Sequence, residues 1–142
     1  MSALLFHPIT IRNTVFKNRI AMSPMCMHSA TVDGYITDFH IVHYGARALG
    51  GAGLIMLETA SVLPNGPIGP GDIGIWDDHH VEGLSRVIEV IQRFGAKAGA
   101  QLGHAGRQHV LRPARSHAVP VGGSGRPDGV RPARGRQQQR DR

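Results

Sequence analysis

Short apolar runs alternate with longer amphipathic segments between residues 19 and 102. The runs at 19–23, 54–60 and 97–102 are predicted strands, and the second is continuously apolar, as in a strand buried on both faces. Helices are predicted between them, because apolar residues recur there at spacings of three and four. Strands that alternate with helices pair in parallel through right-handed crossovers. The pattern predicts an α/β fold, either an open doubly wound sheet or a (β/α)8 barrel.

The first helix is expected to begin at Thr37 or Asp38 and to stop at the glycines of Gly50–Gly53. These glycines end a helix and enter a strand, whereas a phosphate-binding loop follows a strand and opens a helix, so they predict a turn. The second helix is expected to begin near Asp77–Asp78. The apolar faces expected to pack inward are Phe39, Val42, Ala46 and Leu49 in the first helix, and Val81, Leu84, Ile88 and Ile91 in the second.

Composition changes near residue 110. Residues 1–110 carry 8 Lys/Arg and 8 Asp/Glu, which leaves 16 − 8 = 8 arginines and 10 − 8 = 2 aspartates for residues 111–142. Segment 111–142 is rich in Arg, Pro and Gly and has too few apolar residues to form a core, so it is predicted to be a disordered tail. Its composition is typical of a shifted reading frame in GC-rich DNA. A basic arm for nucleic acid is disfavoured, because no aromatic residue is interleaved with the arginines.

The chain holds one cysteine, no secretory signal pattern and no apolar run long enough to span a bilayer. These features predict a cytoplasmic protein without disulfides or a membrane partner. Nine histidines raise the possibility of a metal site, and His40 and His43 lie three residues apart. No carboxylate or thiol stands at a matching ligand spacing, so no metal site is expected. His79 and His80, near a helix start, are expected to be solvated.

Cys26 is the single cysteine and directly follows the first predicted strand. A free cysteine is often a small buried hydrophobic residue. Active sites of parallel α/β folds, however, lie where strands end and loops begin. His28, two residues further on, could serve a nucleophilic thiol as a base. Position alone leaves the structural and the functional interpretation of Cys26 open.

Several sequence blocks, in order, resemble a known family. They are Leu5-Phe6-His7-Pro8-Ile9-Thr10-Ile11-Arg12-Asn13, Lys17-Asn18-Arg19-Ile20-Ala21-Met22-Ser23-Pro24-Met25-Cys26-Met27, His43-Tyr44-Gly45-Ala46-Arg47-Ala48, Gly50-Gly51-Ala52-Gly53-Leu54-Ile55 and Gln101-Leu102-Gly103-His104-Ala105-Gly106-Arg107. Together they look like the N-terminal part of the Old Yellow Enzyme family, and most like its bacterial branch of NADPH dehydrogenases and xenobiotic reductases. The resemblance covers residues 4–108.

This resemblance implies a (β/α)8 barrel with non-covalent FMN, reduced by NAD(P)H and reoxidised by an activated alkene such as an enone. By resemblance, the cofactor-binding residues are Ser23, Pro24, Met25, Cys26, Ala60 and Gln101. Ala60 would approach the ring with its backbone, and Gln101 would bind the pyrimidine edge. Cys26 would tune the redox potential of the flavin. His28 stands where many relatives carry a ligand-contacting tyrosine, so the resemblance gives it a contact with the ligand.

A complete barrel of this kind has eight strands in roughly 250 residues, and the matching region accounts for three. The sequence therefore predicts residues 1–110 to be the N-terminal part of an FMN-binding barrel, truncated and inactive by itself. Intact relatives are expected to form homo-oligomers. The alternatives are a non-enzymatic remnant, a nucleic-acid binder that uses the basic tail, or a barrel completed by a separate chain.

Overall fold

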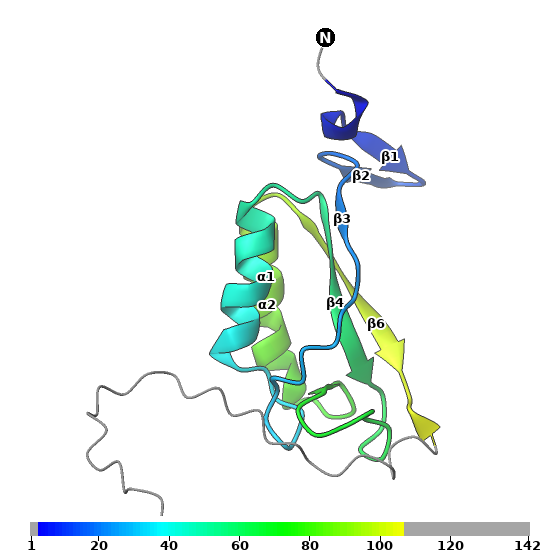
Figure 1. Ribbon diagram of the computed structural model, residues 1–142, viewed down its shortest axis with the longest axis vertical. Coiled ribbons are helices and arrows are strands. Elements are labelled where there is room, and N and C mark those ends of the chain that lie inside the picture. Colours follow the sequence, from blue (N-terminus) through cyan, green and yellow to red (C-terminus); the bar gives the residue numbers. More distant parts are fainter. Residues whose placement is uncertain (1–2, 107–142) are drawn as a thin grey trace, which may run out of the picture.

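The computed structural model describes residues 3–106 of the chain. It has an α/β architecture in which strands and helices alternate, as predicted (Figure 1). The expected tail, 111–142, lies outside the described residues. The elements in chain order are the 3-10 helix η1 (Leu4–Phe6), β1 (Ile9–Ile11), β2 (Thr14–Phe16), β3 (Ala21–Met22), α1 (Asp38–Leu49), β4 (Leu54–Ser61), β5 (Ile73–Gly74), α2 (His80–Arg93) and β6 (Lys97–Gly103).

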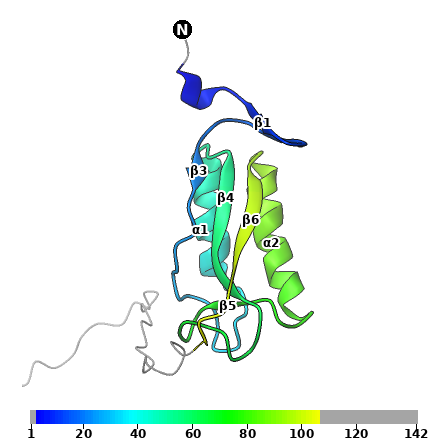
Figure 2. The ribbon, with the colours of Figure 1, turned by 90° about the vertical axis from the view of Figure 1, so that its right-hand side faces the viewer.

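Strand β4 is the centre of a four-stranded parallel sheet (Figure 2). Strand β6 pairs along one edge of β4, from Leu54↔Lys97 to Ser61↔Gly103. On the other edge, β3 pairs with the beginning of β4 and β5 with its end. All three pairings are parallel, which confirms the predicted β-α-β-α-β order.

Helices α1 and α2 cover the same face of this sheet (Figures 1 and 2). They approach closely at Gly45, where a Cβ atom would lie 2.8 Å from Val90 Cγ1, so a larger residue would push the helices apart. Gly51, in the turn after α1, has a φ of 101°, a value that glycine adopts without steric cost. The core between helices and sheet consists of Tyr44, Ala48, Ile55, Leu57, Val87, Ile91 and Ala96.

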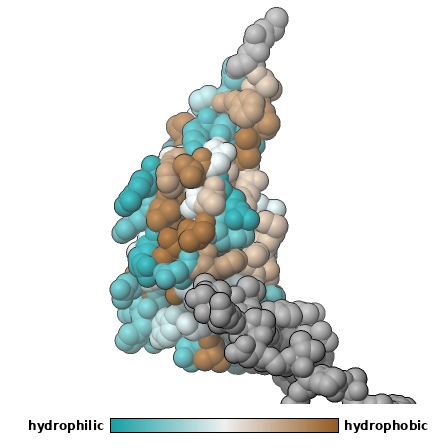
Figure 3. Space-filling model, turned by 60° about the vertical axis from the view of Figure 1, so that its left-hand side comes forward, coloured by the Kyte–Doolittle hydropathy of each residue, from teal (hydrophilic) through white to brown (hydrophobic). Residues whose placement is uncertain are grey.

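The buried face of α1 differs from the predicted one. All four residues predicted to pack inward, Phe39, Val42, Ala46 and Leu49, are exposed, and apolar side chains are visible on this side of the molecule (Figure 3). In α2, Val81 is exposed as well, contrary to its prediction. The face that packs on the sheet instead consists of His40, His43, Tyr44, Gly45 and Ala48. The prediction failed because apolar spacing does not select histidine, whereas His40 and His43 are both buried here.

His80 also differs from its prediction, because it is buried rather than solvated. Its Nδ1 lies 3.0 Å from the carbonyl oxygen of Asp77, and its Nε2 lies 3.0 Å from that of Asp33. The ring also stacks on Tyr35, with centroids 4.8 Å apart. His80 is therefore a core residue that links the start of α2 to the loop before α1, while its neighbour His79 is exposed.

Other differences concern short strands. The antiparallel hairpin β1–β2 and the two-residue strand β5 were not predicted, and β3 has two residues where the sequence predicted 19–23. Helix α2 begins at His80, slightly after the predicted Asp77–Asp78. Within residues 3–106, no helix is long and apolar enough to cross a bilayer.

Candidate functional site

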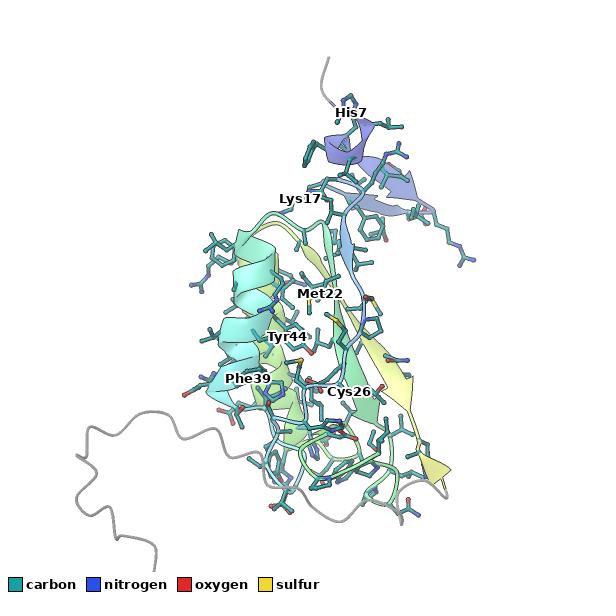
Figure 4. The ribbon with its side chains drawn as sticks, viewed as in Figure 1. His7, Lys17, Met22, Cys26, Phe39 and Tyr44 are labelled. Atoms are coloured by element: carbon teal, nitrogen blue, oxygen red, sulfur yellow. The ribbon has the colours of Figure 1, made fainter. Side chains whose placement is uncertain are left out.

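The loop after β3 returns to the carboxyl-terminal half of β4 (Figure 4). The backbone N–H of Met27 donates a hydrogen bond to Glu58 Oε2 over 2.6 Å. This contact places Cys26 beside β4, with its side chain exposed. Met25, on the same loop, is 49% exposed. Two sulfur-containing side chains are thus presented to solvent at the carboxyl end of the sheet.

Glu58 occupies an irregular position in β4. Leu57 pairs with Ala100 and Thr59 pairs with Gln101, so Glu58 has no partner of its own in β6. An extra residue of this kind is a β-bulge, which turns a side chain away from its regular direction. The Glu58 side chain is fully buried and meets α1. The bulge therefore explains how an acidic residue in a central strand reaches the layer between sheet and helices.

The Glu58 carboxylate has polar neighbours on both sides. The Tyr44 hydroxyl donates to Oε1 at 3.3 Å and accepts from the Glu58 backbone N–H at 2.9 Å, and His40 Nε2 lies 3.5 Å from Oε1. Burial acts to raise the pKa of Glu58, but His40 and the backbone N–H groups of Met27 and His28 outweigh it, so the pKa is lowered. Glu58 is consequently a buried anion. Burial raises the pKa of Tyr44, so its hydroxyl stays protonated.

His40 and His43 both lie in this buried layer between the sheet and the helices. The backbone N–H of Thr37 donates to His40 Nδ1 at 3.1 Å, so the neutral His40 ring carries its proton on Nε2, which faces Glu58. Burial, followed by the charge of Arg47, lowers the pKa of His43. Residues 3–106 contain no group of three or more His, Cys, Asp or Glu side chains placed to hold a metal ion.

Gln101 lies on β6 with its side chain exposed on the sheet face opposite the helices. The Thr59 hydroxyl donates to Gln101 Oε1 at 3.0 Å. Glycines flank Gln101 on this face because neighbouring side chains fill the space: a Cβ on Gly99 would lie 2.5 Å from Met56 Sδ, and one on Gly103 would lie 2.3 Å from Thr59 Cγ2. Gly99 and Gly103 of β6 therefore leave room for the side chains of Met56 and Thr59 on β4.

The predicted site residues lie toward the carboxyl ends of the parallel strands. Ala60 pairs with β5 on one side and with Leu102 of β6 on the other, next to the Thr59↔Gln101 pair. Cys26 lies beside the same half of β4, because its neighbour Met27 is hydrogen-bonded to Glu58. Cys26 and Gln101 are exposed, whereas the Ala60 side chain is buried. Ser23 is exposed and Pro24 is half-buried, and both lie between the end of β3 and Cys26.

His28 has a partner that sequence reasoning missed. Its Nδ1 lies 2.6 Å from Oδ1 of Asp72, whose side chain is only 1% exposed. His28 has a φ of 51°, a left-handed conformation that is uncommon for residues other than glycine. The contact joins the loop after β3 to the loop after β4. Glu58 was missed as well, although an acidic residue inside an otherwise apolar strand was a visible signal.

An apolar hollow of about 150 Å³ lies at the other end of the sheet. Residues of the hairpin β1–β2 and the beginnings of β3 and β4 line it, including Ile9, Phe16 and Leu54. It lies at the amino ends of the strands, whereas Cys26 and Gln101 lie toward the carboxyl ends. The hollow is therefore separate from the candidate site.

The chain is similar to known flavin-dependent enzymes. The NADH:flavin oxidoreductase / NADH oxidase family matches residues 4–133. The match runs past residue 110, where the sequence was expected to leave the family pattern. The NADPH dehydrogenase of Bacillus cytotoxicus is 48% identical over 123 residues, which are 84% of this chain and 36% of that protein. This chain thus spans about a third of that relative.

Solved structures show the same similarity. An old yellow enzyme homologue from Zymomonas mobilis is 34% identical with a TM-score of 0.66, and the match covers 72% of this chain and 28% of that one. The Old Yellow Enzyme from Pichia sp. is 28% identical with a TM-score of 0.69, over 74% of this chain and 27% of that one. The parallel sheet and its two helices therefore correspond to part of the Old Yellow Enzyme barrel, which confirms the predicted fold class.

Proposed function

Because the chain belongs to the NADH:flavin oxidoreductase / NADH oxidase family, we propose that the carboxyl ends of its parallel strands form part of the FMN site of an ene-reductase. The observation that supports this proposal is that Cys26 follows β3 and Gln101 lies on β6, both toward the carboxyl ends of strands that run parallel. In α/β barrels, ligands bind at this end of the strands. Bound FMN would supply the hydride chemistry between NAD(P)H and an activated alkene.

The residues present fit the ring portion of FMN. Gln101 accepts from Thr59 through Oε1, which leaves its amide N–H groups to donate to carbonyl oxygens of a pyrimidine edge. The thioether of Met25 and the thiol of Cys26 are polarizable and suit contact with an aromatic ring. Ser23 and Pro24 would complete this wall, and the backbone of Ala60 would line the site between them and Gln101.

Cys26 is proposed to tune the redox potential of the ring rather than to act as a covalent nucleophile. His28 is proposed to contact the ligand above it. The chain spans about a third of the Bacillus cytotoxicus NADPH dehydrogenase. We therefore assign activity only to a protein that includes the remaining barrel strands. The 142 residues by themselves are proposed to bind the ring without completing turnover.

Titration of FMN with the 142-residue chain, followed by flavin fluorescence, tests the proposal. Gln101→Ala should weaken binding about five- to tenfold, because one ring-directed hydrogen-bonding side chain is lost. Gln92→Ala is the matched control, since Gln92 is an exposed glutamine at the end of α2. Equal FMN binding by all three proteins, or no binding by any of them, would count against the proposed site.

A further inference from the structure

The two loops at the rim of the candidate site are joined by one side-chain pair. His28 belongs to the loop after β3, and Asp72 immediately precedes β5, at the end of the loop after β4. The distance from His28 Nδ1 to Asp72 Oδ1 is 2.6 Å. The Asp72 side chain is 1% exposed, while that of His28 is 37% exposed. The pair therefore has a buried carboxylate on one side and an accessible imidazole on the other.

Asp72 is held in place independently of His28. Its Oδ2 accepts the backbone N–H groups of Ile68 and Gly69, at 2.6 and 3.1 Å. Its Oδ1 is buried and, within residues 3–106, accepts no hydrogen bond of regular geometry; its polar neighbour there is the His28 imidazole, at ion-pair distance. A buried carboxylate oxygen requires a donor. His28 is the group positioned to supply one.

The backbone of His28 is fixed as well. The N–H of Ala30 donates to the carbonyl oxygen of Gly71 at 2.8 Å, so the two loops are hydrogen-bonded next to the pair. Gly71 has a φ of 89°, and a Cβ atom there would lie 2.5 Å from the carbonyl oxygen of His28. Only a glycine allows this approach without a shift of the backbone. The imidazole is thus oriented by its backbone and by Asp72.

The chemistry of the pair determines the tautomer. An ionised carboxylate only accepts hydrogen bonds, so the proton of a neutral His28 must lie on Nδ1. Nε2 then carries a lone pair and no hydrogen. Asp72 occupies Nδ1, so Nε2 is the ring nitrogen left for a ligand on a side chain that is 37% exposed.

We propose that Asp72 is a positioning residue that fixes His28 as its Nδ1–H tautomer, so that Nε2 selects ligands with a hydroxyl group at this point of the rim. The ligand part of this inference rests on the proposed function, while the tautomer does not. A tyrosine, which the Old Yellow Enzyme pattern carries here, both donates and accepts a hydrogen bond. Neutral His28 held by Asp72 only accepts, so it favours a hydroxyl over an ether or a carbonyl.

The tautomer is tested by long-range ¹H–¹⁵N NMR of the 142-residue chain at a pH of about 9, where an ordinary imidazole is neutral. The signals of His28 are identified by their loss in His28→Gln. The expected result is a protonated Nδ1 in the unsubstituted chain. Asp72→Asn should shift the proton to Nε2, because the amide oxygen keeps the N–H groups of Ile68 and Gly69 and its NH2 group then faces Nδ1. Asp33→Asn, a substitution of an exposed aspartate, should leave the spectrum of His28 unchanged. A neutral His28 with its proton on Nε2 in the unsubstituted chain would by itself overturn the proposal.

The ligand class is tested with FMN present, by comparing 4-hydroxycyclohex-2-enone with its 4-methoxy analogue. The hydroxy compound should bind about fivefold more tightly and shift the Nε2 resonance, because one hydrogen bond distinguishes the two. His28→Phe should remove this preference. Equal binding of the two compounds would overturn the ligand assignment. Failure of the chain to bind FMN would instead reject the proposed function, and the NMR spectra would still decide the tautomer.

Discussion

The backbone N–H of Met27 donates a hydrogen bond of 2.6 Å to the buried Glu58 carboxylate. Glu58 sits at a bulge in the central strand and also accepts from the Tyr44 hydroxyl. One carboxylate therefore connects the loop that carries Cys26, the sheet and helix α1. Any site built on Cys26 depends on this connection, because the loop itself has no strand pairing beyond Met22.

Glu58→Gln should destabilise the fold. Both carboxylate oxygens of Glu58 accept hydrogen bonds, one from the Met27 N–H and one from the Tyr44 hydroxyl. A glutamine has only one carbonyl oxygen, so its NH2 group would face one of these two donors. That buried donor would then have no acceptor. The expected loss in free energy of unfolding is about 1–3 kcal/mol, measured by urea denaturation. Glu89→Gln, on the exposed side of α2, is the control and should change it little. Equal effects of the two substitutions would show that Glu58 is not the anchor.

Stability should fall in acid because of Glu58. Its pKa in the folded chain is lowered from the ordinary value of 4.5, since the contribution of His40 and the Met27 N–H exceeds the effect of burial. The resulting stabilisation is present above pH 4.5 and is lost as the pH falls through the lowered pKa. The difference in unfolding free energy between the unsubstituted chain and Glu58→Gln should therefore shrink below that pH. A difference that is constant down to strongly acidic pH would contradict this assignment.

Two glycines of one loop should respond differently to alanine. Gly71 has a positive φ, and its Cβ would contact the His28 carbonyl, whereas a Cβ on Gly69 would meet nothing within 4 Å. Gly71→Ala should lower the free energy of unfolding by roughly 1–3 kcal/mol and loosen the His28–Asp72 pair. Gly69→Ala should be close to neutral by the same measurement of thermal or urea unfolding. A neutral Gly71→Ala would indicate that the two loops are not packed as described.

Cys26→Ala should change the midpoint potential of bound FMN by tens of millivolts. The thiol is exposed at the rim, and its polarizable sulfur would contact the ring directly. Cys26→Ser keeps a small polar group and should produce a smaller change. Spectroelectrochemical titration of the FMN-loaded proteins measures this effect. An unchanged potential in Cys26→Ala would reject the proposed tuning role.

Sequence patterns predicted the strands and helices that are long and locally consistent. Strand β4 is apolar along most of its length, and α1 and α2 were expected close to where they occur. The hairpin β1–β2 and strand β5 contain at most three residues each, so no periodicity could develop in them. Their pairing is decided by contacts with distant residues, which a local pattern does not contain.

The prediction of which face of α1 is buried was wrong for a related reason. Apolar spacing selected Phe39, Val42 and Leu49, but the helix buries His40 and His43 against the layer that contains Glu58. His40 is partnered by Thr37 at the helix N-cap and lies 3.5 Å from Glu58, a residue of another element. Helical periodicity alone therefore assigned the faces by hydrophobicity and missed the polar contacts.

For the site, the family resemblance supplied Cys26, Ala60 and Gln101, and the rule that ligands bind at the carboxyl ends of parallel strands agrees with these positions. The structure brings these positions to the same end of the sheet, and their roles remain proposals. The supporting acids were not predicted: Glu58 is 31 residues from Met27, and Asp72 contacts His28 across the gap between two loops. Such partners appear only when the fold places them.

The central claim is that this sheet end binds the flavin ring, and a chimera tests it most directly. Residues 4–106 of this chain would replace the matching segment of the Bacillus cytotoxicus NADPH dehydrogenase, and the FMN content of the purified protein would be measured by absorbance. The account predicts a yellow protein that retains FMN and loses part of it on Gln101→Ala but not on Gln92→Ala. A folded, colourless chimera would contradict it.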